Sequence, residues 1–285
     1  MQDSAGAGPA GNCYHKQLII KKMKSTTFLL AVILLPAIAL GQMKKYEYSP
    51  KVKGKIEIKN LLGEVTLQNS AGSSIIIESD FDMETPERAE GLKLLGAAED
   101  NSGIGVNISE ENGVVLVSGA VKQVRDYKYK ISVPAGASVN LDYNSPFVAG
   151  DLVIESFKGS LETKTLAASV KITNTTGPLT VNTISGNVEV VFSNINQEAP
   201  TSLASISGLI DVTVPSGEKA TVNISNMNGN VYNNLDLKPV KEAAADKRAE
   251  GMSPIRQDIG DFTLNGGGQK LLLKSISGNI YLRKK

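Results

Sequence analysis

Residues 150–190 read GDLVIESFKGSLETKTLAASVKITNTTGPLTVNTISGNVEV, and this stretch decides the fold class. A small residue recurs every nine positions, at Gly150, Gly159, Ala168, Gly177 and Gly186. The second and fourth positions after it are apolar with one exception, whereas the first and third are mostly polar. Such alternation is typical of a strand with one buried and one solvated face. Each unit therefore predicts a short strand, and its glycine predicts a turn, because glycine adopts positive φ without strain.

The same unit returns at longer spacing, as Ser205-Ile-Ser-Gly208, Ser225-Asn-Met-Asn-Gly229 and Ser275-Ile-Ser-Gly278. The steps from Gly186 to Gly208 and from Gly208 to Gly229 are 22 and 21 residues. A coil of about 20 residues that carries two strands accounts for both steps, and self-similarity at a fixed period indicates a solenoid. We therefore expect an all-β fold, a parallel β-helix or β-roll with short coils, in which stacked strands align equivalent side chains in columns.

The first 41 residues predict processing rather than fold. Residues 23–41 have a basic start, an apolar stretch from Phe28 to Leu40 and a small-residue end, which together indicate a secretory signal peptide. The apolar stretch is shorter than the roughly 20 residues that a membrane-spanning helix needs, so a membrane anchor is the weaker alternative. Because a signal peptide begins near its initiator, we expect translation from Met23 and interpret residues 1–22 as a non-native upstream extension.

The single cysteine, Cys13, and the single histidine, His15, both precede Met23. The expected mature chain, 42–285, therefore has no disulfide, no thiol nucleophile, no histidine base and no histidine metal ligand. We expect no cofactor, no metal site and no catalytic residues. With 26 basic and 28 acidic residues the mature chain has a net charge of −2, which does not favour nucleic acid as a partner.

The mature chain is expected to form one domain, with an N-terminal sheet over 50–134 and the solenoid over 137–285. Thr85, Pro86 and Gly96 are suitable capping residues, and they predict one short helix over 85–96. A charged, alanine-rich insertion covers 238–260. Such insertions project from one face of a solenoid and often bind ligands, although a mobile surface loop is the plainer interpretation.

The order of these motifs resembles one known family. A signal peptide precedes Pro-Glu-Arg-Ala-Glu at 86–90, Tyr-x-Ile-x-Val-Pro-x-Gly at 129–136, the Ser-x-Ser-Gly coils, Asn265-Gly-Gly-Gly and the terminal Ser-Gly-Asn-Ile-Tyr-Leu-Arg. Residues 50–285 are similar in this way to the bacterial putative-adhesin family of β-solenoid domains, in the style of Bacteroidetes-like members. The resemblance implies a β-solenoid of unknown function and carries over no catalytic residues.

Stacking of the coils predicts one outward column of mixed chemistry. If Ala168, Gly186 and Gly208 open successive coils, the matching outward positions form a column, with two tyrosines at the same position in later coils. The members of this column are Lys171, Glu189, Asp211, Tyr232 and Tyr281. An acidic, basic and aromatic column of this kind can contact sugars. Its alternative is a solvated ladder of weak ion pairs worth about 0–1 kcal/mol each. The glycines at 266–268 predict a turn, since no Lys-Ser or Lys-Thr follows them to form a phosphate loop.

Two functional classes remain. The first is an exported, non-enzymatic adhesin or scaffold module of the cell envelope that binds a glycan, an envelope protein or its own kind. The second is a secreted β-helix polysaccharide lyase or glycosidase, which needs carboxylates clustered in a cleft. The acidic residues here are dispersed along alternating strands, so the sequence favours the first class. It leaves open the ligand, the oligomeric state and the choice between periplasm and cell surface.

Overall fold

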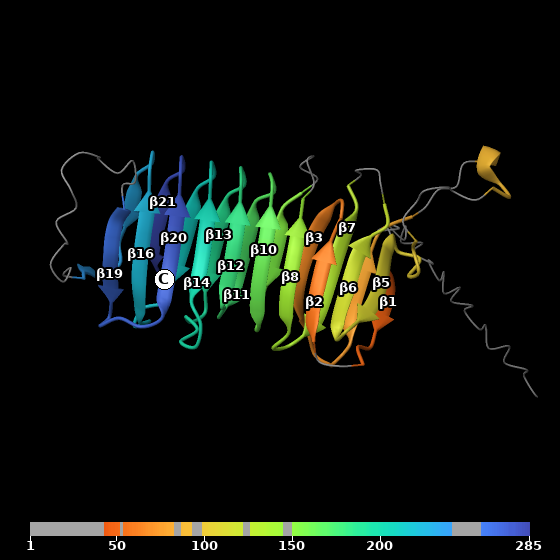
Figure 1. Cartoon of the computed structure of the whole chain (residues 1–285), viewed down its shortest axis with the longest axis horizontal. Helices are drawn as coiled ribbons and strands as arrows, with labels where there is room; N and C mark the ends of the chain where they lie inside the picture. Colours follow the sequence, from red (N-terminus) through yellow and green to blue (C-terminus); the bar gives the residue numbers. More distant parts are fainter. Residues whose placement is uncertain are drawn as a thin grey trace, which may run out of the picture. The chain divides into compact units, whose positions relative to one another are not determined.

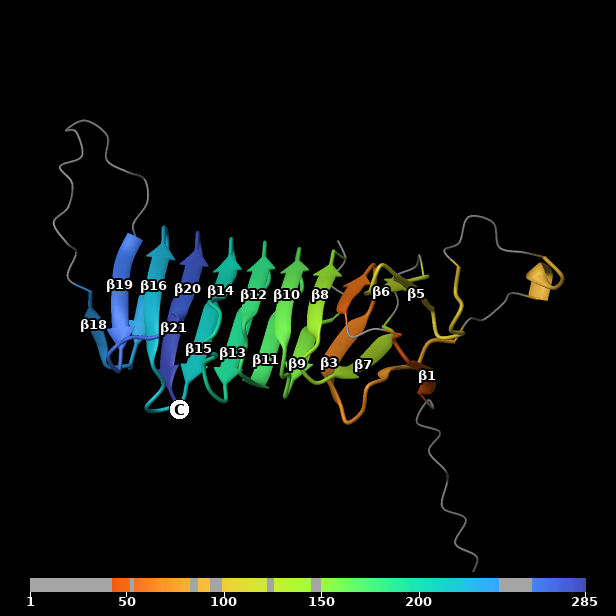
Figure 2. The ribbon, with the colours of Figure 1, turned by 60° about the horizontal axis from the view of Figure 1, so that its bottom comes forward.

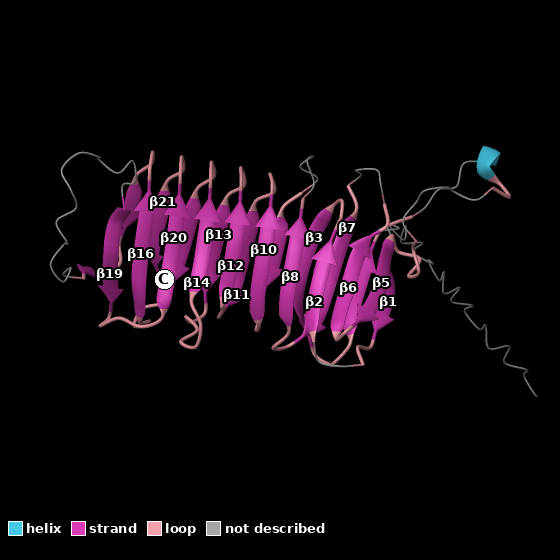
Figure 3. Ribbon diagram, in the orientation of Figure 1, coloured by secondary structure: helices cyan, strands magenta, loops and turns pink. Residues whose placement is uncertain are grey.

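The computed structural model describes residues 43–51, 54–82, 87–92, 99–121, 126–144, 150–240 and 258–285. These residues belong to one compact unit, Gly41–Lys285. The unit is all-β, with two large mixed sheets that lie face to face (Figures 1 and 3). The expected signal peptide and upstream extension lie outside the described residues.

The ten-stranded sheet, called sheet A, has the strand order β1-β4-β7-β3-β9-β11-β13-β15-β21-β17. Its strands are β1 (Lys44–Tyr48), β3 (Glu64–Ser70), β4 (Ile75–Ser79), β7 (Lys128–Pro134), β9 (Leu152–Glu155), β11 (Val170–Thr175), β13 (Val188–Phe192), β15 (Ile210–Val214), β17 (Val231–Asn233) and β21 (Ile280–Lys284).

The eleven-stranded sheet, called sheet B, has the order β18-β19-β16-β20-β14-β12-β10-β8-β2-β6-β5. Its strands are β2 (Lys55–Lys59), β5 (Val106–Glu111), β6 (Val114–Gly119), β8 (Ser138–Tyr143), β10 (Ser160–Thr165), β12 (Leu179–Thr183), β14 (Thr201–Ser205), β16 (Ala220–Asn226), β18 (Leu237–Pro239), β19 (Asp258–Leu264) and β20 (Lys270–Ser275).

The nine-residue rhythm of the sequence sets how the central strands pair. From β8 to β15, successive strands belong alternately to sheet B and sheet A, and within each sheet they pair in parallel. Val170 lies opposite both Leu152 and Val188, and Leu161 lies opposite Leu179. Partners are therefore two nine-residue units apart, so each unit contributes one strand and every second unit returns to the same sheet.

The order of strands departs from the order of the sequence near both ends of the sheets (Figure 2). Strands β20 and β21, the last in the chain, lie between β14 and β16 in sheet B and between β15 and β17 in sheet A. In the same way, β2 and β3 lie between β6 and β8 and between β7 and β9. Strands from 50–134 and from 137–285 thus share the same two sheets.

Antiparallel pairs occur at three of the four sheet ends and make both sheets mixed, whereas the outermost strand β17 pairs in parallel with β21. Strands β1 and β4 follow β7 in sheet A, and β5 follows β6 in sheet B. At the other end, β19 and β18 extend sheet B beyond β16. Sheet A ends there on the three-residue strand β17, which pairs only with β21 among the described strands.

One continuous core of aliphatic side chains lies between the sheets. Inward positions such as Val188 and Val190 on β13 are fully buried, while Glu189 between them is exposed. The alternation predicted for the strands is therefore confirmed. The helix predicted over 85–96 is not shown, because the described residues 87–92 contain only the 3-10 turn η1 (Glu87–Ala89). None of the residues in η1 is buried, so it has no apolar face to pack against the core.

Glycine is required at the start of these strands for two different structural reasons. Gly177 has φ of +79°, as predicted for a turn glycine. Gly208 is needed instead for close approach between neighbouring turns, because a Cβ there would lie 2.5 Å from the carbonyl carbon of Gly186. The Ser-x-x-Gly pattern supports this turn, since the buried Ser205 Oγ accepts a hydrogen bond of 2.8 Å from the Gly208 N–H. The positive-φ explanation predicted for Gly208 is therefore replaced by backbone packing.

Candidate functional site

The five predicted column residues lie in one row on the outer face of sheet A, here called the outer row. In register, Lys171 pairs with Glu189, Glu189 with Asp211, Asp211 with Tyr281, and Tyr281 with Tyr232. The structure thus brings all five together. Tyr281 precedes Tyr232 in this row, the reverse of their order in the sequence, because β21 lies between β15 and β17.

The two tyrosines at the end of the outer row form a stacked pair. The ring centroids of Tyr232 and Tyr281 are 5.2 Å apart, and the ring planes differ by 10°. Tyr232 is 51% exposed. Because β17 is the terminal strand of sheet A in the described part of the chain, no further strand of the sheet continues this stack beyond Tyr232.

Arg283 holds the other side of Tyr281. Its Nε donates to both carboxylate oxygens of Asp211, at 2.9 and 3.0 Å, and its guanidinium carbon lies 5.3 Å from the Tyr281 ring centroid. The hydrogen bond and the charge of Asp211 raise the pKa of Arg283. Arg283 leans toward β15, whereas Tyr232 lies on β17, on the opposite side of β21. A guanidinium and a second ring therefore flank Tyr281, and the Asn279 Nδ2 donates to its hydroxyl at 3.1 Å.

A shallow hollow of about 190 Å³ adjoins the tyrosine pair. It is lined by Tyr232, Asn233, Asn234, Tyr281, Leu282 and Arg283. Aromatic, amide and guanidinium groups thus meet around one small space. A second hollow, of about 30 Å³, lies among Pro215, Leu235 and Lys284, and has room for little more than water.

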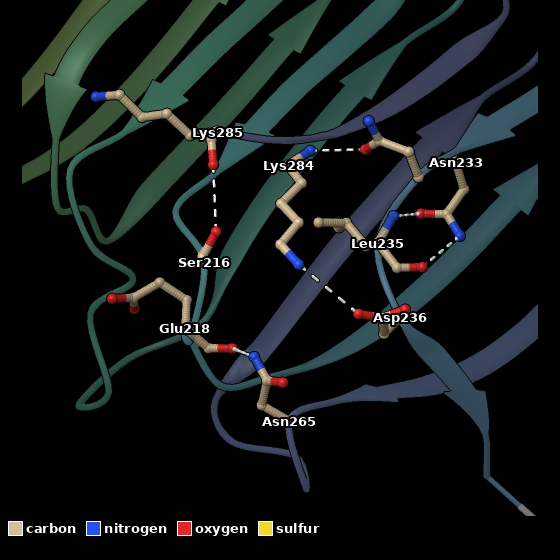
Figure 4. A network of polar contacts seen from close by, with 9 residues as sticks. Ser216, Glu218, Asn233, Leu235, Asp236, Asn265, Lys284 and Lys285 are labelled. Carbon is tan, nitrogen blue, oxygen red and sulfur yellow. Dashed lines mark hydrogen bonds and ion pairs between the residues drawn. The ribbon is translucent and has the colours of Figure 1, made fainter.

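Backbone contacts fix the amides that line the larger hollow (Figure 4). The Asn233 side chain accepts from the Leu235 N–H at 2.8 Å and donates to the Leu235 carbonyl at 3.0 Å. The Asn234 Oδ1 accepts from the Lys284 N–H at 2.7 Å. The Asn233 amide is therefore held by the segment that follows β17, and the Asn234 amide is held by β21.

The C-terminal residues contribute directly to this region. The Lys285 N–H donates to the Val214 carbonyl at 2.9 Å. The Ser216 hydroxyl donates to the Lys285 carbonyl at 3.2 Å (Figure 4). The Lys284 Nζ lies 3.8 Å from Asp236. Arg283, Asn233 and Asn234 were not predicted as site residues. The local sequence does not predict their role, because their contacts depend on the pairing of β21 with strands that are distant along the chain.

The other features singled out in the sequence form turns and strand ends or lie outside the described residues. The glycines at 266–268 form part of the turn between β19 and β20, where the Gly267 N–H donates to the Leu264 carbonyl at 3.0 Å. The two ends of the insertion predicted over 238–260 form parts of β18 and β19. Residues 241–257 of this insertion lie outside the described residues. Within the described ranges, no three histidine, cysteine or acidic side chains gather in a way that could hold a metal ion, and no helix is long and apolar enough to cross a membrane.

No family model matches this chain, and neither does any curated protein. Several solved structures show a distant likeness, among them the following three. A putative cell adhesion protein from Clostridium sporogenes is 10% identical with a TM-score of 0.45, and the match covers 86% of this chain and all of that one. A putative adhesin from Bacteroides fragilis is 12% identical with a TM-score of 0.37, covering 85% and 97%. A putative adhesin from Parabacteroides merdae is 10% identical with a TM-score of 0.27, covering 86% and 97%. These names agree with the family that the sequence resembles.

Proposed function

We propose that this chain is an exported, non-enzymatic binding module of the bacterial cell envelope, an adhesin-like protein. The observation that carries the proposal is the end of the outer row, where an exposed pair of stacked tyrosines adjoins a polar hollow. Aromatic side chains with a polar neighbour are the usual anchors of a recognition surface. The expected signal peptide and the resemblance to the putative-adhesin family support export and an envelope location.

The scaffold that we propose for this module is a β-solenoid with two strands in each coil. Two features support it: the alternation of β8 to β15 between the sheets, and the parallel register between units 18 residues apart. In such a scaffold each coil contacts only its neighbours, and every outward position becomes part of a straight row. Binding residues can then be added on the outer face without disturbing the core.

The arrangement favours recognition over catalysis. Hydrolysis or elimination of a polysaccharide needs two carboxylates, or a carboxylate and a base, held about 5–10 Å apart around the scissile bond. Beside the hollow, the carboxylate of Asp211 is engaged by Arg283 through both of its oxygens. A carboxylate neutralised in this way is a structural partner for the tyrosine pair rather than a free acid or base.

The first experiment is to locate the protein and to test attachment. The full chain with a C-terminal epitope tag, expressed in a Gram-negative host, is expected to lose its leader near residue 41 and to reach the envelope. External protease on intact cells then separates surface exposure, which gives digestion, from a periplasmic position, which gives protection. A variant that lacks residues 24–41 is the control for export.

Attachment is tested with beads that carry the purified mature chain, incubated with glycan-coated surfaces and with bacterial envelope fractions. The proposal expects retention above that of uncoated beads. Retention of the full chain in the cytoplasm would contradict it. So would turnover of a uronic-acid polymer that is abolished by an acid-to-amide substitution, since that result would favour the lyase or glycosidase.

A further inference from the structure

We propose that the tyrosine pair and the adjoining hollow bind one neutral hexopyranose unit of a glycan, with the sugar ring stacked on the outward face of Tyr232. This inference rests on the proposed function and names the ligand class of that same surface. The juxtaposition that carries it is a stacked, exposed tyrosine at the terminal strand of sheet A beside a hollow lined by two asparagines and an arginine.

A pyranose ring suits the exposed face of Tyr232. One face of such a sugar presents several C–H groups, whose hydrogens carry partial positive charge. An aromatic ring carries partial negative charge on its face, so a flat C–H surface is attracted to it much as a cation is. The stack that starts at Arg283 and runs through Tyr281 to Tyr232 has room for one more flat group on its outer side, because β17 ends the described part of sheet A.

Tyr232 is held ready for such a ligand. It stacks on Tyr281, and Tyr281 is itself positioned by Asn279 at its hydroxyl and by Arg283 near its ring. A ring fixed before binding loses little conformational freedom when the ligand arrives, which preserves affinity. Tyr281 is thus a positioning residue, and Tyr232 is the residue that contacts the sugar.

The rim of the hollow supplies partners for hydroxyl groups. Asn233 and Asn234 present amides, and each amide has more donor and acceptor positions than their backbone contacts use. The hollow of about 190 Å³ is smaller than the roughly 300 Å³ at which ordinary small-molecule sites begin. It therefore fits a single sugar unit at the end or side of a glycan rather than several consecutive units.

The charge of the site selects a neutral sugar. Arg283 is the one cation among the residues that line the hollow, and its charge is balanced by Asp211 through both carboxylate oxygens. In the order Arg283, Tyr281, Tyr232 and sugar, two rings also separate this guanidinium from the ligand, so it offers no free cation to a uronic acid or sialic acid. The proposal therefore commits to a neutral hexopyranose, and a preference for acidic sugars is an outcome that would contradict it.

The experiment measures binding of methyl glycosides of glucose, galactose, mannose and N-acetylglucosamine to the purified mature chain, 42–285. Saturation-transfer NMR gives the bound face, and titration gives the affinity. We expect at least one neutral glycoside to bind, with saturation concentrated on the ring protons of one face. Binding of methyl glucuronoside alone, or of none of the glycosides, would overturn the inference.

Three substitutions at one position separate stacking from other effects. Tyr232→Ala is expected to weaken binding at least about tenfold, and Tyr232→Leu, which is apolar without a flat face, about fivefold or more. Tyr232→Phe keeps the ring and is expected to stay within about threefold of the parent. Lys171→Ala, in the same outer row but three strands from the pair, is the matched control and should leave binding unchanged.

The outcome distinguishes this inference from the proposed function. If the beads attach equally well with and without Tyr232→Ala, the binding module stands and the tyrosine site is refuted. If sedimentation shows a dimer that Tyr232→Ala converts to monomer, the open edge of β17 binds a second copy of the chain and the sugar assignment is wrong. Thermal melts of every variant are expected to show that the fold is retained, because the position is exposed.

Discussion

Substitution of Gly208 by alanine should damage the stacking of neighbouring turns. In the structure, a Cβ at Gly208 would lie 2.5 Å from the carbonyl carbon of Gly186 and 3.0 Å from the Asn187 nitrogen. Real Cβ atoms essentially never approach other atoms to less than 3.0 Å. The obstacle is the backbone of Gly186 and Asn187, so no flexible side chain can move away, and the two turns must separate.

The expected cost follows from this separation. Overpacking by one methyl group in a close-packed region typically costs about 1–3 kcal/mol. Separation of the turns also weakens the hydrogen bond from the Ser205 hydroxyl to the Gly186 carbonyl, at 3.3 Å, and the one from the Val188 N–H to the Leu209 carbonyl, at 2.9 Å. Each buried bond is worth about 1 kcal/mol. The sum is a loss of about 3–5 kcal/mol, which for a domain of this size lowers Tm by on the order of 10 °C.

The assay is urea unfolding of the mature chain followed by circular dichroism, with thermal melts in parallel. Gly72→Ala is the matched control, because no atom lies within 4 Å of a Cβ built there. The control should be neutral or stabilising by up to about 1 kcal/mol, since alanine restricts the unfolded chain. If Gly208→Ala costs less than about 1 kcal/mol, or no more than Gly72→Ala, the argument from backbone approach is wrong.

Three smaller perturbations test the buried polar groups. Tyr143→Phe should destabilise by about 1–2 kcal/mol because its hydroxyl donates to a backbone carbonyl at 2.6 Å, whereas Tyr129→Phe should cost less because the buried Tyr129 hydroxyl, with Ser79 beside it, makes no hydrogen bond of good geometry among the described residues. Urea unfolding compares the two variants, and equal losses would contradict the reasoning. Burial raises the pKa of Tyr129, so the neutral phenol is favoured in the folded state, and the free energy of unfolding should fall as the pH rises above 10. The fall between pH 10 and 12 should be smaller in Tyr129→Phe. Ser205→Ala leaves a buried N–H without its acceptor and should cost about 1–3 kcal/mol, against less than about 0.5 kcal/mol for the exposed Ser207→Ala; a matching cost at both would refute the role given to Ser205.

The local pattern of the sequence determined which side chains share a row. Because successive side chains on a strand point to opposite faces, the nine-residue units set the inward and outward positions of each strand. This is why Lys171, Glu189 and Asp211 could be placed in one row before the structure was known, and why the tyrosines could be added to it. The alternation also placed the aliphatic core correctly. The capping residues that predicted a short helix over 85–96 were a weaker guide, since the described residues 87–92 contain only the exposed turn η1.

Only the tertiary structure decided the order in which the strands stack. The repeat units have nearly the same pattern, so any of them offers a neighbour the same backbone hydrogen bonds and a similar apolar face. Local sequence therefore cannot say that β21 pairs with β15 and β17, strands that are distant along the chain. That pairing places Tyr281 between Asp211 and Tyr232, brings Arg283 to Asp211 and leaves Tyr232 on the terminal strand of sheet A. The sequence alone determined the membership of the outer row, and long-range strand pairing made its end a candidate binding site.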